Sequence, residues 1–412
     1  MNKNLPIKHL LHTFASQAAE QPIEVVFWDG ERRTYCRQPD TLKQKPVCTI
    51  HFKTRKALQQ TLFQGSLGFG EAYTMGDIEI EGDLQQLIKL SLNPKIESCL
   101  GTDTLSKIRP ILGCFTNLNS IKGARQAISF HYDRGNDFYR EWLDQSMTYS
   151  CAYFRQENNT LEQAQEDKYE HICRKLLLQP GDKLIDIGCG WGGMLIYAAR
   201  HYHISGEGYT LSRNQLEFAQ QRSVELGISD RIKFHLRDYR EATGIFDKFV
   251  SIGMFEHVGS KHYPDFFTMT NRLLKTGGIG ILHTIGKNDG SPTDPWITTY
   301  IFPGGELPQL YDICRHMGQT SLQINDLENL RRHYYLTLQN WIKRFENRLI
   351  HIRNLLGGNQ EKIEQFIRCW RLYLNGSAVS FLHGNLNLYQ LTFTKGLVNE
   401  LPLTRDYLYQ TN

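Results

Sequence analysis

The stretch from Leu184 to Gly193 reads LIDIGCGWGG, a short apolar run that breaks into closely spaced glycines. An apolar run of this length predicts a buried strand, and the glycines predict a tight turn from that strand into a helix. A glycine has no Cβ, so the main chain of such a turn can approach a bound nucleotide closely. The stretch therefore predicts the first strand of a ligand-binding sheet.

Strands and helices alternate around this turn. Helical segments such as SRNQLEFAQQRSVELG (212–227) separate the strands, and a helix from Thr160 through about Leu178, with Thr160 and Gln163 at capping-box spacing, precedes the first one. This order predicts an α/β fold with a doubly wound, mostly parallel sheet. The further strand candidates are HISGEGY (203–209), RIKFHL (231–236), FDKFVSIGM (246–254) and GGIGILHTI (277–285).

Additional segments follow the alternating region. Residues 286–308 form an insertion rich in proline and glycine, and two long amphipathic helices come after it. Their apolar stripe fits either a protein core or the lining of an acyl-chain site. LYQLTF at 388–393 is the last strand candidate and is expected to close the sheet. The apolar positions are Leu338, Trp341, Ile342, Phe345, Leu349 and Ile352 in the first helix, and Ile363, Phe366, Ile367 and Trp370 in the second.

The first third of the chain has a different pattern, which predicts a smaller α+β domain. A helix is expected from Leu5 to about Glu20, followed by strand-like stretches such as IEVVFWDG. The glycines of GSLGFGEAYTMGDIEIEGDL (65–84) predict tight turns around a hairpin, in which IEIEG alternates as a strand does. We place the domain boundary near residue 120, giving domains 1–120 and 121–412.

Length and composition are those of an ordinary globular protein. The chain has 412 residues, of which 40% are hydrophobic and 22% charged, and no segment approaches the roughly 20 apolar residues of a membrane-spanning helix. The amino terminus, MNKNLPIKHLLHTF, makes a poor secretory signal, so a cytoplasmic location is expected. The nine cysteines contain no CxxC pair, which predicts that most of them are free, buried thiols and that they form no metal site.

The net charge of +4 lies in the first third of the chain. Residues 1–130 hold 16 Lys and Arg against 12 Asp and Glu, whereas the remainder is balanced at 31 against 31. This bias fits an ordinary solvated surface, and it also fits contact with an anionic surface such as a phospholipid bilayer. No dense basic cluster with interleaved aromatic residues occurs, so nucleic acid is not expected as a partner.

The glycine turn itself narrows the class of ligand. It lacks the GK[ST] ending of a triphosphate-binding loop. Asp186 stands two residues before the first glycine, and its carboxylate favours a ligand with a positively charged amino end over a pyrophosphate. The turn is therefore expected to hold a ligand with a positively charged amino end.

With these features the sequence resembles the class I S-adenosylmethionine-dependent methyltransferases. Among them, it resembles the cyclopropane-fatty-acyl-phospholipid synthase family. The resemblance covers nearly the whole chain and implies a seven-stranded methyltransferase sheet with appended helices. Its amino-terminal part is carried by GSLGFGEAY in the first third. The other matching motifs are YSCAYF (149–154), LIDIGCGWG (184–192), GYTLSRNQ (208–215), MFEHVG (254–259), LHTIG (282–286) and HYYLTLQNW (333–341).

The resemblance implies a set of residues that contact S-adenosylmethionine. Thr210 and Asp238 each follow a strand candidate, which agrees with a ligand crevice at the carboxyl ends of the strands. The sequence offers no account of Glu207, which lies inside the second strand. The implied set is Tyr149, Ser150, Asp186, Gly188, Gly190, Gly192, Thr210, Leu211, Ser212, Gln215, Asp238 and Tyr239.

The resemblance also implies a site for a bicarbonate ion, held by Cys151, Glu256, His283, Tyr334 and the main chain of Ile285. Methyl addition to a cis double bond leaves a carbocation, and closing the three-membered ring requires a base to remove a proton from the new methyl group. Bicarbonate would be that base, and its own hydroxyl proton would be donated to Glu256. A carbocation also needs a dry site and is stabilised by aromatic faces. The candidates for those faces are Tyr132, Tyr153 and Tyr334.

The expected substrate is the unsaturated acyl chain of a membrane phospholipid. The protein would reach it by peripheral contact with the inner face of the membrane, through the basic first domain and the 286–308 insertion. The resemblance implies a homodimer. Ser377 stands where several relatives have a cysteine, so a cysteine nucleophile is not expected there.

Three alternatives remain open. One is an enzyme of the same superfamily that adds a methyl branch without closing a ring, or acts on carrier-bound mycolate-type acids. Another is a small-molecule N-methyltransferase. The third belongs to a different class, a non-catalytic lipid-binding protein that retains the cofactor fold.

Overall fold

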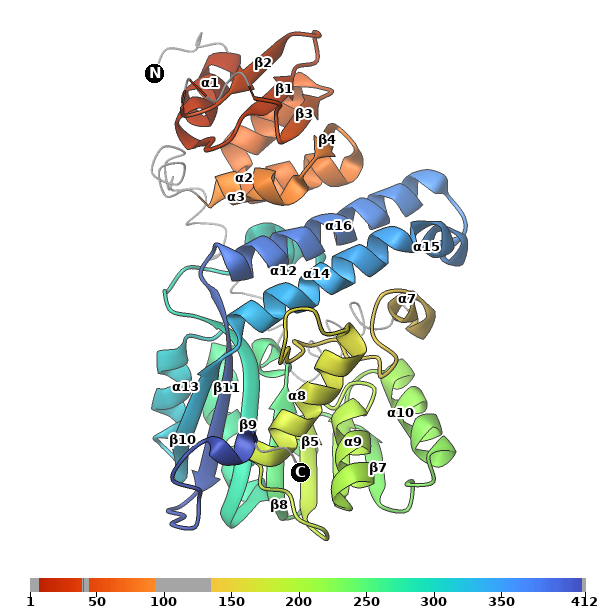
Figure 1. The fold of residues 1–412 in the computed structure, drawn as a ribbon, viewed down its shortest axis with the longest axis vertical. Helices are drawn as coiled ribbons and strands as arrows, with labels where there is room; N and C mark the ends of the chain where they lie inside the picture. Colours follow the sequence, from red (N-terminus) through yellow and green to blue (C-terminus); the bar gives the residue numbers. More distant parts are fainter. Residues whose placement is uncertain (1–6, 39, 41–43, 93–134, 410–412) are drawn as a thin grey trace. The chain divides into compact units, whose positions relative to one another are not determined.

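The computed structural model describes residues 7–38, 40, 44–92 and 135–409. The chain divides into two compact units (Figure 1). The first comprises residues 1–117, 294–301 and 356–384, and the second comprises 118–293, 302–355 and 385–412. The predicted boundary at 120 falls outside the described residues. Segments 294–301 and 356–384, which we expected in the second domain, belong to the first unit.

The second unit is built on a seven-stranded sheet of order β10-β11-β9-β8-β5-β6-β7. Strands β5 to β9 pair in parallel, whereas β11 runs antiparallel to both β9 and β10. The α/β fold with a mostly parallel sheet is therefore confirmed. The strands are β5 (Lys183–Ile187), β6 (Ser205–Thr210), β7 (Ile232–Leu236), β8 (Phe246–Ile252), β9 (Leu274–Lys287), β10 (Leu322–Asn329) and β11 (Leu386–Lys395).

Two details of this sheet differ from the sequence expectation. The strand expected to close the sheet, β11, lies inside it between β9 and β10. The edge is formed by β10, which the sequence analysis did not identify. Much of β10 is exposed or only half-buried, so it lacks the apolar pattern of a central strand.

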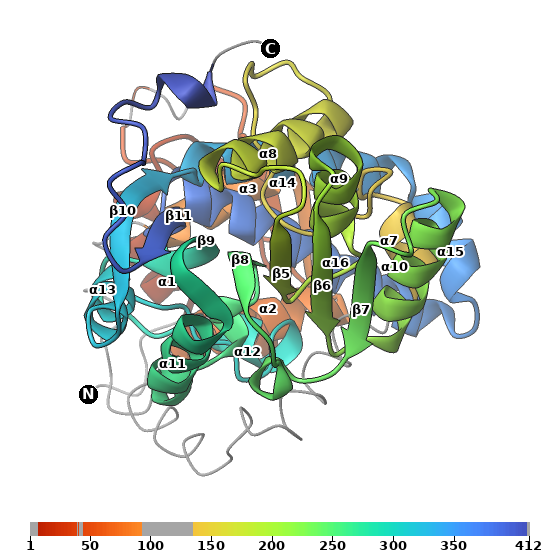
Figure 2. The ribbon, with the colours of Figure 1, turned by 90° about the horizontal axis from the view of Figure 1, so that it is seen from below.

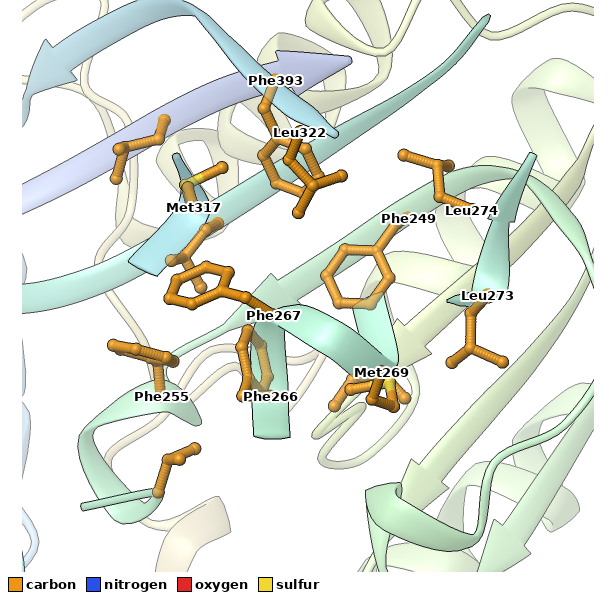
Figure 3. Packing of buried hydrophobic residues seen from close by; sticks show 14 of the residues in the cluster. Phe249, Phe255, Phe266, Phe267, Met269, Leu273, Leu274, Met317, Leu322 and Phe393 are labelled. Atoms are coloured by element: carbon orange, nitrogen blue, oxygen red, sulfur yellow. The ribbon is translucent and has the colours of Figure 1, made fainter. Parts of the chain in front are cut away.

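Helices cover both faces of the sheet, as Figure 2 shows with α8 and α9 on one side and α11 on the other. Buried side chains of α11 and α13 join Phe249 and Phe393 of the strands in one core cluster, part of which is drawn in Figure 3. A second cluster joins α8, α9 and α10 to the opposite face. The helices of this unit are α7 (Asn136–Arg140), α8 (Leu161–Lys175), α9 (Gly193–Tyr202), α10 (Arg213–Glu225), α11 (Tyr263–Leu273), α13 (Leu310–Met317), α14 (Arg331–Asn347) and α15 (Leu349–Leu356).

The first unit holds a four-stranded sheet of order β2-β1-β3-β4 together with helices. Two of these helices come from later parts of the chain: α12 contacts α2, and α16 contacts both α2 and α3. The strands are β1 (Ile23–Val26), β2 (Arg32–Tyr35), β3 (Cys48–Phe52) and β4 (Ile78–Gly82). The helices are α1 (Ile7–Ala18), α2 (Arg55–Met75), α3 (Leu84–Ser91), α12 (Pro295–Tyr300) and α16 (Gln360–Leu382).

The glycine-rich stretch at 65–73 is helical, so the prediction of tight turns around a hairpin was wrong there. These glycines allow close packing along α2. A Cβ on Gly68 would come within 2.1 Å of the carbonyl oxygen of Gln60, and one on Gly70 within 2.3 Å of the Trp296 ring. Gly65 has φ +58° and kinks the helix. Only IEIEG forms the expected strand, β4.

No helix in the described part of the chain combines the length and hydropathy needed to cross a bilayer.

Candidate active site

A pocket opens at the carboxyl ends of β5, β6 and β8, next to the point where the strand order reverses. Ligands of doubly wound sheets bind at such points, because the loops that leave neighbouring strands diverge there. Of the residues predicted to contact S-adenosylmethionine, all except Gly192 and Ser212 line this pocket. The residues that line it are Tyr149, Ser150, Asp186, Gly188, Gly190, Thr210, Leu211, Gln215, Asp238 and Tyr239.

The glycine turn shapes one wall of the pocket. Gly188, Gly190 and Gly192 all have positive φ, which disfavours any side chain. A Cβ on Gly188 would lie 2.6 Å from the Cβ of Met254, and one on Gly192 would lie 2.8 Å from the Phe234 ring. Gly190 has no protein atom within 4 Å of its Cβ position and faces the pocket. Gly192 thus serves packing, whereas Gly190 leaves room for a ligand.

Ser212, the other predicted residue that does not line the pocket, is a helix cap. Its Oγ accepts a hydrogen bond from the main-chain N–H of Gln215 at the start of α10. The side chain of Gln215 is fixed in turn, because the hydroxyl of Thr210 donates to its Oε1 at 2.7 Å. These bonds hold the loop after β6 in place.

Two acidic side chains near the pocket already have partners. Asp238 accepts from Nε and Nη2 of Arg240 at 2.7 and 2.8 Å, so its carboxylate is neutralised within the protein. Glu207, which had no predicted role, contacts His235 and Tyr209, with 2.9 Å between its Oε2 and Nε2 of His235. Glu207 therefore ties β6 to β7 and does not line the pocket.

Lys168, which was not among the predicted site residues, lines the pocket from α8. Its Nζ donates to Oγ of Ser150 at 3.0 Å, and the side chain is buried. Burial lowers the pKa of Lys168 to about 7. The neighbouring Gln165 donates to the carbonyl of Ser150 at 3.0 Å. Lys168 lies four and seven residues after Ala164 and Leu161, on the buried face of the helix, and that spacing was the available signal.

Glu256 and Ile285 are joined directly. The main-chain N–H of Ile285 donates to Oε1 of Glu256 at 2.7 Å, and Oε2 is buried without a hydrogen-bond partner among the described residues. Burial raises the pKa of Glu256 to about 7. This carboxyl group can therefore exchange a proton near neutral pH.

His283 lies two residues before Ile285 on the same face of β9. Its main-chain oxygen accepts from the N–H of Gly253, which lines the pocket. Its Nδ1 lies 3.1 Å from Nε2 of Gln390, and its own Nε2 is buried with no partner in the described structure. Burial holds the pKa of His283 well below its ordinary value, so the ring is neutral.

Cys151 and Tyr334 both contact the main chain of Leu330. The main-chain oxygen of Leu330 lies 4.0 Å from Sγ of Cys151 and also accepts from the N–H of Tyr334 at 3.1 Å. The N–H of Leu330 donates to Leu388, which pairs with Ile285 across β11 and β9. Main-chain bonds thus link the segments that carry Cys151, Tyr334 and Ile285, while none of the five predicted catalytic residues lines the pocket itself. Burial raises the pKa of the Cys151 thiol, which stays protonated.

Of the three tyrosines expected to stabilise a cation, Tyr132 lies outside the described residues. The Tyr153 ring is stacked between the rings of His171 and His333, whose centroids lie 4.2 and 4.8 Å from its own. Its ring faces are covered by these imidazoles, so Tyr153 is not available for the expected role. The Tyr334 ring packs edge-on against the Trp341 ring, with 6.0 Å between the ring centroids. In the described residues, no cluster of His, Cys, Asp and Glu has the arrangement of a metal site.

Comparison with known proteins identifies the class. The chain is an S-adenosylmethionine-dependent methyltransferase with the fold of that class. More narrowly, residues 119–391 match the family described as mycolic acid cyclopropane synthetase, and the chain belongs to that family. Residues 10–102 match a separate domain family of unknown function.

Individual relatives span most of the chain. The cyclopropane-fatty-acyl-phospholipid synthase of Escherichia coli is 38% identical, covering 86% of this chain and 90% of that protein. A probable fatty acid methyltransferase of Pseudomonas putida is 36% identical, with coverage of 96% and 98%. The solved structure of the cyclopropane synthase MmaA2 from Mycobacterium tuberculosis has a TM-score of 0.62 at 33% identity and covers 66% of this chain and 98% of its own.

Proposed function

We propose that the protein transfers a methylene group from S-adenosylmethionine across the cis double bond of unsaturated phospholipid acyl chains, forming a cyclopropane ring. The observation that carries the proposal is that Oε2 of Glu256 and Nε2 of His283 are each buried without a partner in the described residues. Glu256 bonds to Ile285, two residues after His283 on β9, and the main chain of His283 bonds to Gly253 of the pocket wall. Of the two unpartnered atoms, one is a proton acceptor and the other a donor. Together they fit a small anion that both accepts and donates a hydrogen bond.

Bicarbonate has this combination of groups, and when bound it supplies the base that removes a proton from the new methyl group. Glu256 would hold it by accepting its hydroxyl proton at Oε2, with Ile285 fixing the carboxylate through Oε1. His283 would donate from Nε2 to an oxygen of the anion. Cys151 and Tyr334 would complete the site, and the buried surroundings would keep water from the carbocation.

The test is to incubate the pure protein with S-adenosylmethionine and vesicles of cis-unsaturated phospholipid. We expect the olefinic proton signals to fall while ring methylene signals rise, and we expect the rate to drop when bicarbonate is removed from the buffer. A rate that does not depend on bicarbonate would refute that part of the proposal.

A methyl-branched product is the second candidate. It is favoured by the names of relatives, which include the Pseudomonas putida protein and the tuberculostearic acid methyltransferase UfaA1 of Mycobacterium tuberculosis, 35% identical over 396 residues. The same incubation separates the two products, because a branch gives a methyl signal and no ring methylene. Amine methylation, the third candidate, is tested by offering an amine and the lipid together.

We also propose that the first unit carries peripheral contact with the inner face of the membrane. The structure changes how this must be tested, because α16 packs on α2 and α3. Deleting residues 1–120 would strip α16 of that surface and destabilise the chain. Flotation of the full-length protein with anionic and zwitterionic vesicles is the sounder measurement, and equal binding to both would refute an electrostatic contribution. The proposed homodimer is tested by light scattering of the same sample.

The non-catalytic alternative predicts that a triple variant of Cys151, Glu256 and His283 keeps every function of the protein. We expect the variant to bind vesicles as the unaltered protein does and to form no product.

A further inference from the structure

The pocket is lined by a buried ammonium group and a buried carboxyl group that form no ion pair with described residues of the protein. Lys168 and Asp186 both line the pocket, and their exposed fractions are 1% and 2%. Burying an ionised group without a compensating partner is costly, so such groups are retained where a ligand completes them. Each of the two therefore indicates a ligand group of opposite charge.

Lys168 has three N–H donors and uses one of them on a neutral acceptor, Oγ of Ser150. Its Nζ also lies 4.6 Å from the ring centroid of Tyr169. Within the described ranges, no carboxylate oxygen reaches ion-pairing distance of this ammonium. Two other buried lysines of the same unit have a carboxylate nearby: Nζ of Lys175 lies 2.7 Å from Glu328, and Nζ of Lys248 lies 3.8 Å from Asp182.

The nearby acidic side chains do not fill this role. Asp144 is the strongest electrostatic neighbour of Lys168, but its carboxylate is occupied by the main-chain N–H groups of Thr148 at 2.9 Å and Ser146 at 2.8 Å. Asp186 has a buried Oδ1 with no hydrogen-bond partner in the described part of the chain. The ammonium and the Asp186 carboxylate thus share the pocket wall without pairing.

We propose that Lys168 and Asp186 together recognise the zwitterionic amino-acid end of S-adenosylmethionine, with Lys168 binding the α-carboxylate and Asp186 the α-ammonium. The inference rests on the proposed use of S-adenosylmethionine, and it adds Lys168 as a binding residue. Burial lowers the pKa of Lys168 and raises that of Asp186, both to about 7, and the charge of each group partly offsets the shift of the other.

The experiment compares two ligands by calorimetry: S-adenosylhomocysteine and its decarboxylated analogue, which differs only by the carboxylate. On the unaltered protein, loss of the carboxylate should weaken binding at least about 10-fold, as for a hydrogen bond to a charged group. In Lys168→Met the two ligands should bind alike, because the variant removes the partner of the carboxylate. Lys248→Met is the matched control, since Lys248 is also buried but does not line the pocket. It should keep the full preference.

Two results would overturn the inference. One is an unaltered protein that binds both ligands equally, a measurement that does not depend on the folding of any variant. The other is a Lys168→Met protein that keeps the preference for the carboxylate. Failure of the unaltered protein to bind S-adenosylhomocysteine at all would instead refute the proposed co-substrate, so the two failures are distinguishable.

Discussion

The main-chain N–H of Ile285 donates to Oε1 of Glu256 at 2.7 Å and leaves Oε2 of the same carboxylate buried without a partner among the described residues. One oxygen therefore positions the group, and the other is available for chemistry. In Glu256→Gln the amide oxygen can still accept from Ile285, but the second position becomes a donor. We expect the rate of product formation to fall about 100-fold or more, with binding of S-adenosylhomocysteine unchanged. A variant of normal activity would remove Glu256 from the mechanism.

The same carboxyl group predicts a pH dependence. Its pKa is raised by burial to about 7, and the ionised form is the one that accepts a proton. Product formation should therefore rise as the pH increases through about 7, and this limb should be absent from the residual activity of Glu256→Gln. The free energy of unfolding should change with pH in the opposite direction. The folded protein holds this proton more tightly than the unfolded chain, so the contribution of Glu256 to stability falls as the pH rises from about 4.5 to 7. An identical pH profile in both proteins would contradict the assignment.

Gln390 is predicted to position His283. The amide Nε2 of Gln390 lies 3.1 Å from Nδ1 of the His283 ring, so we expect Nδ1 to accept and the ring proton to lie on Nε2. Gln390→Leu should lower activity about 10-fold and change the tautomer seen by nitrogen NMR, without weakening cofactor binding. Thr392→Val is the control, because Thr392 is buried on the same face of β11 and its Oγ1 has no partner in the described structure. If both variants lose activity equally, packing rather than positioning explains the effect.

Gly190 and Gly227 form a matched pair for testing the glycine turn. Both have positive φ, +54° and +66°, and neither has a protein atom within 4 Å of its Cβ position. Alanine should cost about 1–2 kcal/mol of backbone strain at each. Gly190 lines the pocket and Gly227 does not. Only Gly190→Ala should therefore weaken the binding of S-adenosylhomocysteine, by 10-fold or more in calorimetry. Equal affinities of the two variants for this ligand would show that Gly190 does not approach it.

The sequence was informative where local periodicity and structure agree. Apolar runs of β5, β8 and β9 are buried on both faces, so they could be located from sequence, and side chains near their ends, such as Glu256 and His283, could be assigned to one region. Lys168 was missed because a charged residue within a polar helix is normally solvated. Its helical spacing from Leu161 was the only sign of burial.

Errors arose where distant parts of the chain decide the structure. The glycines at 68 and 70 resemble turn signals, yet they are required by the approach of Gln60 across a kink and of Trp296 from a segment more than 200 residues away. Strand β10 carries few buried apolar residues, so its pattern was too weak to detect. The link between Cys151 and Tyr334 passes through Leu330, directly after β10, and could not be anticipated without that strand.

Glu328 connects α8 to β10 and should matter for stability rather than chemistry. Its Oε2 lies 2.7 Å from Nζ of Lys175 and 2.7 Å from Nε2 of His171. Burial acts to raise the pKa of Glu328, but the His171 hydrogen bond and the Lys175 charge outweigh it and hold the pKa at about 2. Glu328→Gln leaves the buried Lys175 without its closest counter-charge, so we expect a loss of about 3 kcal/mol near neutral pH, measured by urea unfolding.

The difference between Glu328→Gln and the unaltered protein should depend on pH in a defined direction. Because the pKa of Glu328 is depressed in the folded state, its stabilising contribution is complete above about 4.5 and is lost as the pH falls towards about 2. The two unfolding midpoints should converge over that interval. Glu157→Gln is the control: Glu157 pairs with Arg332 at 2.8 Å, but both side chains are about three-quarters exposed, so its removal should cost less than about 1 kcal/mol. Equal losses in the two variants would mean that burial does not strengthen the Glu328 pair.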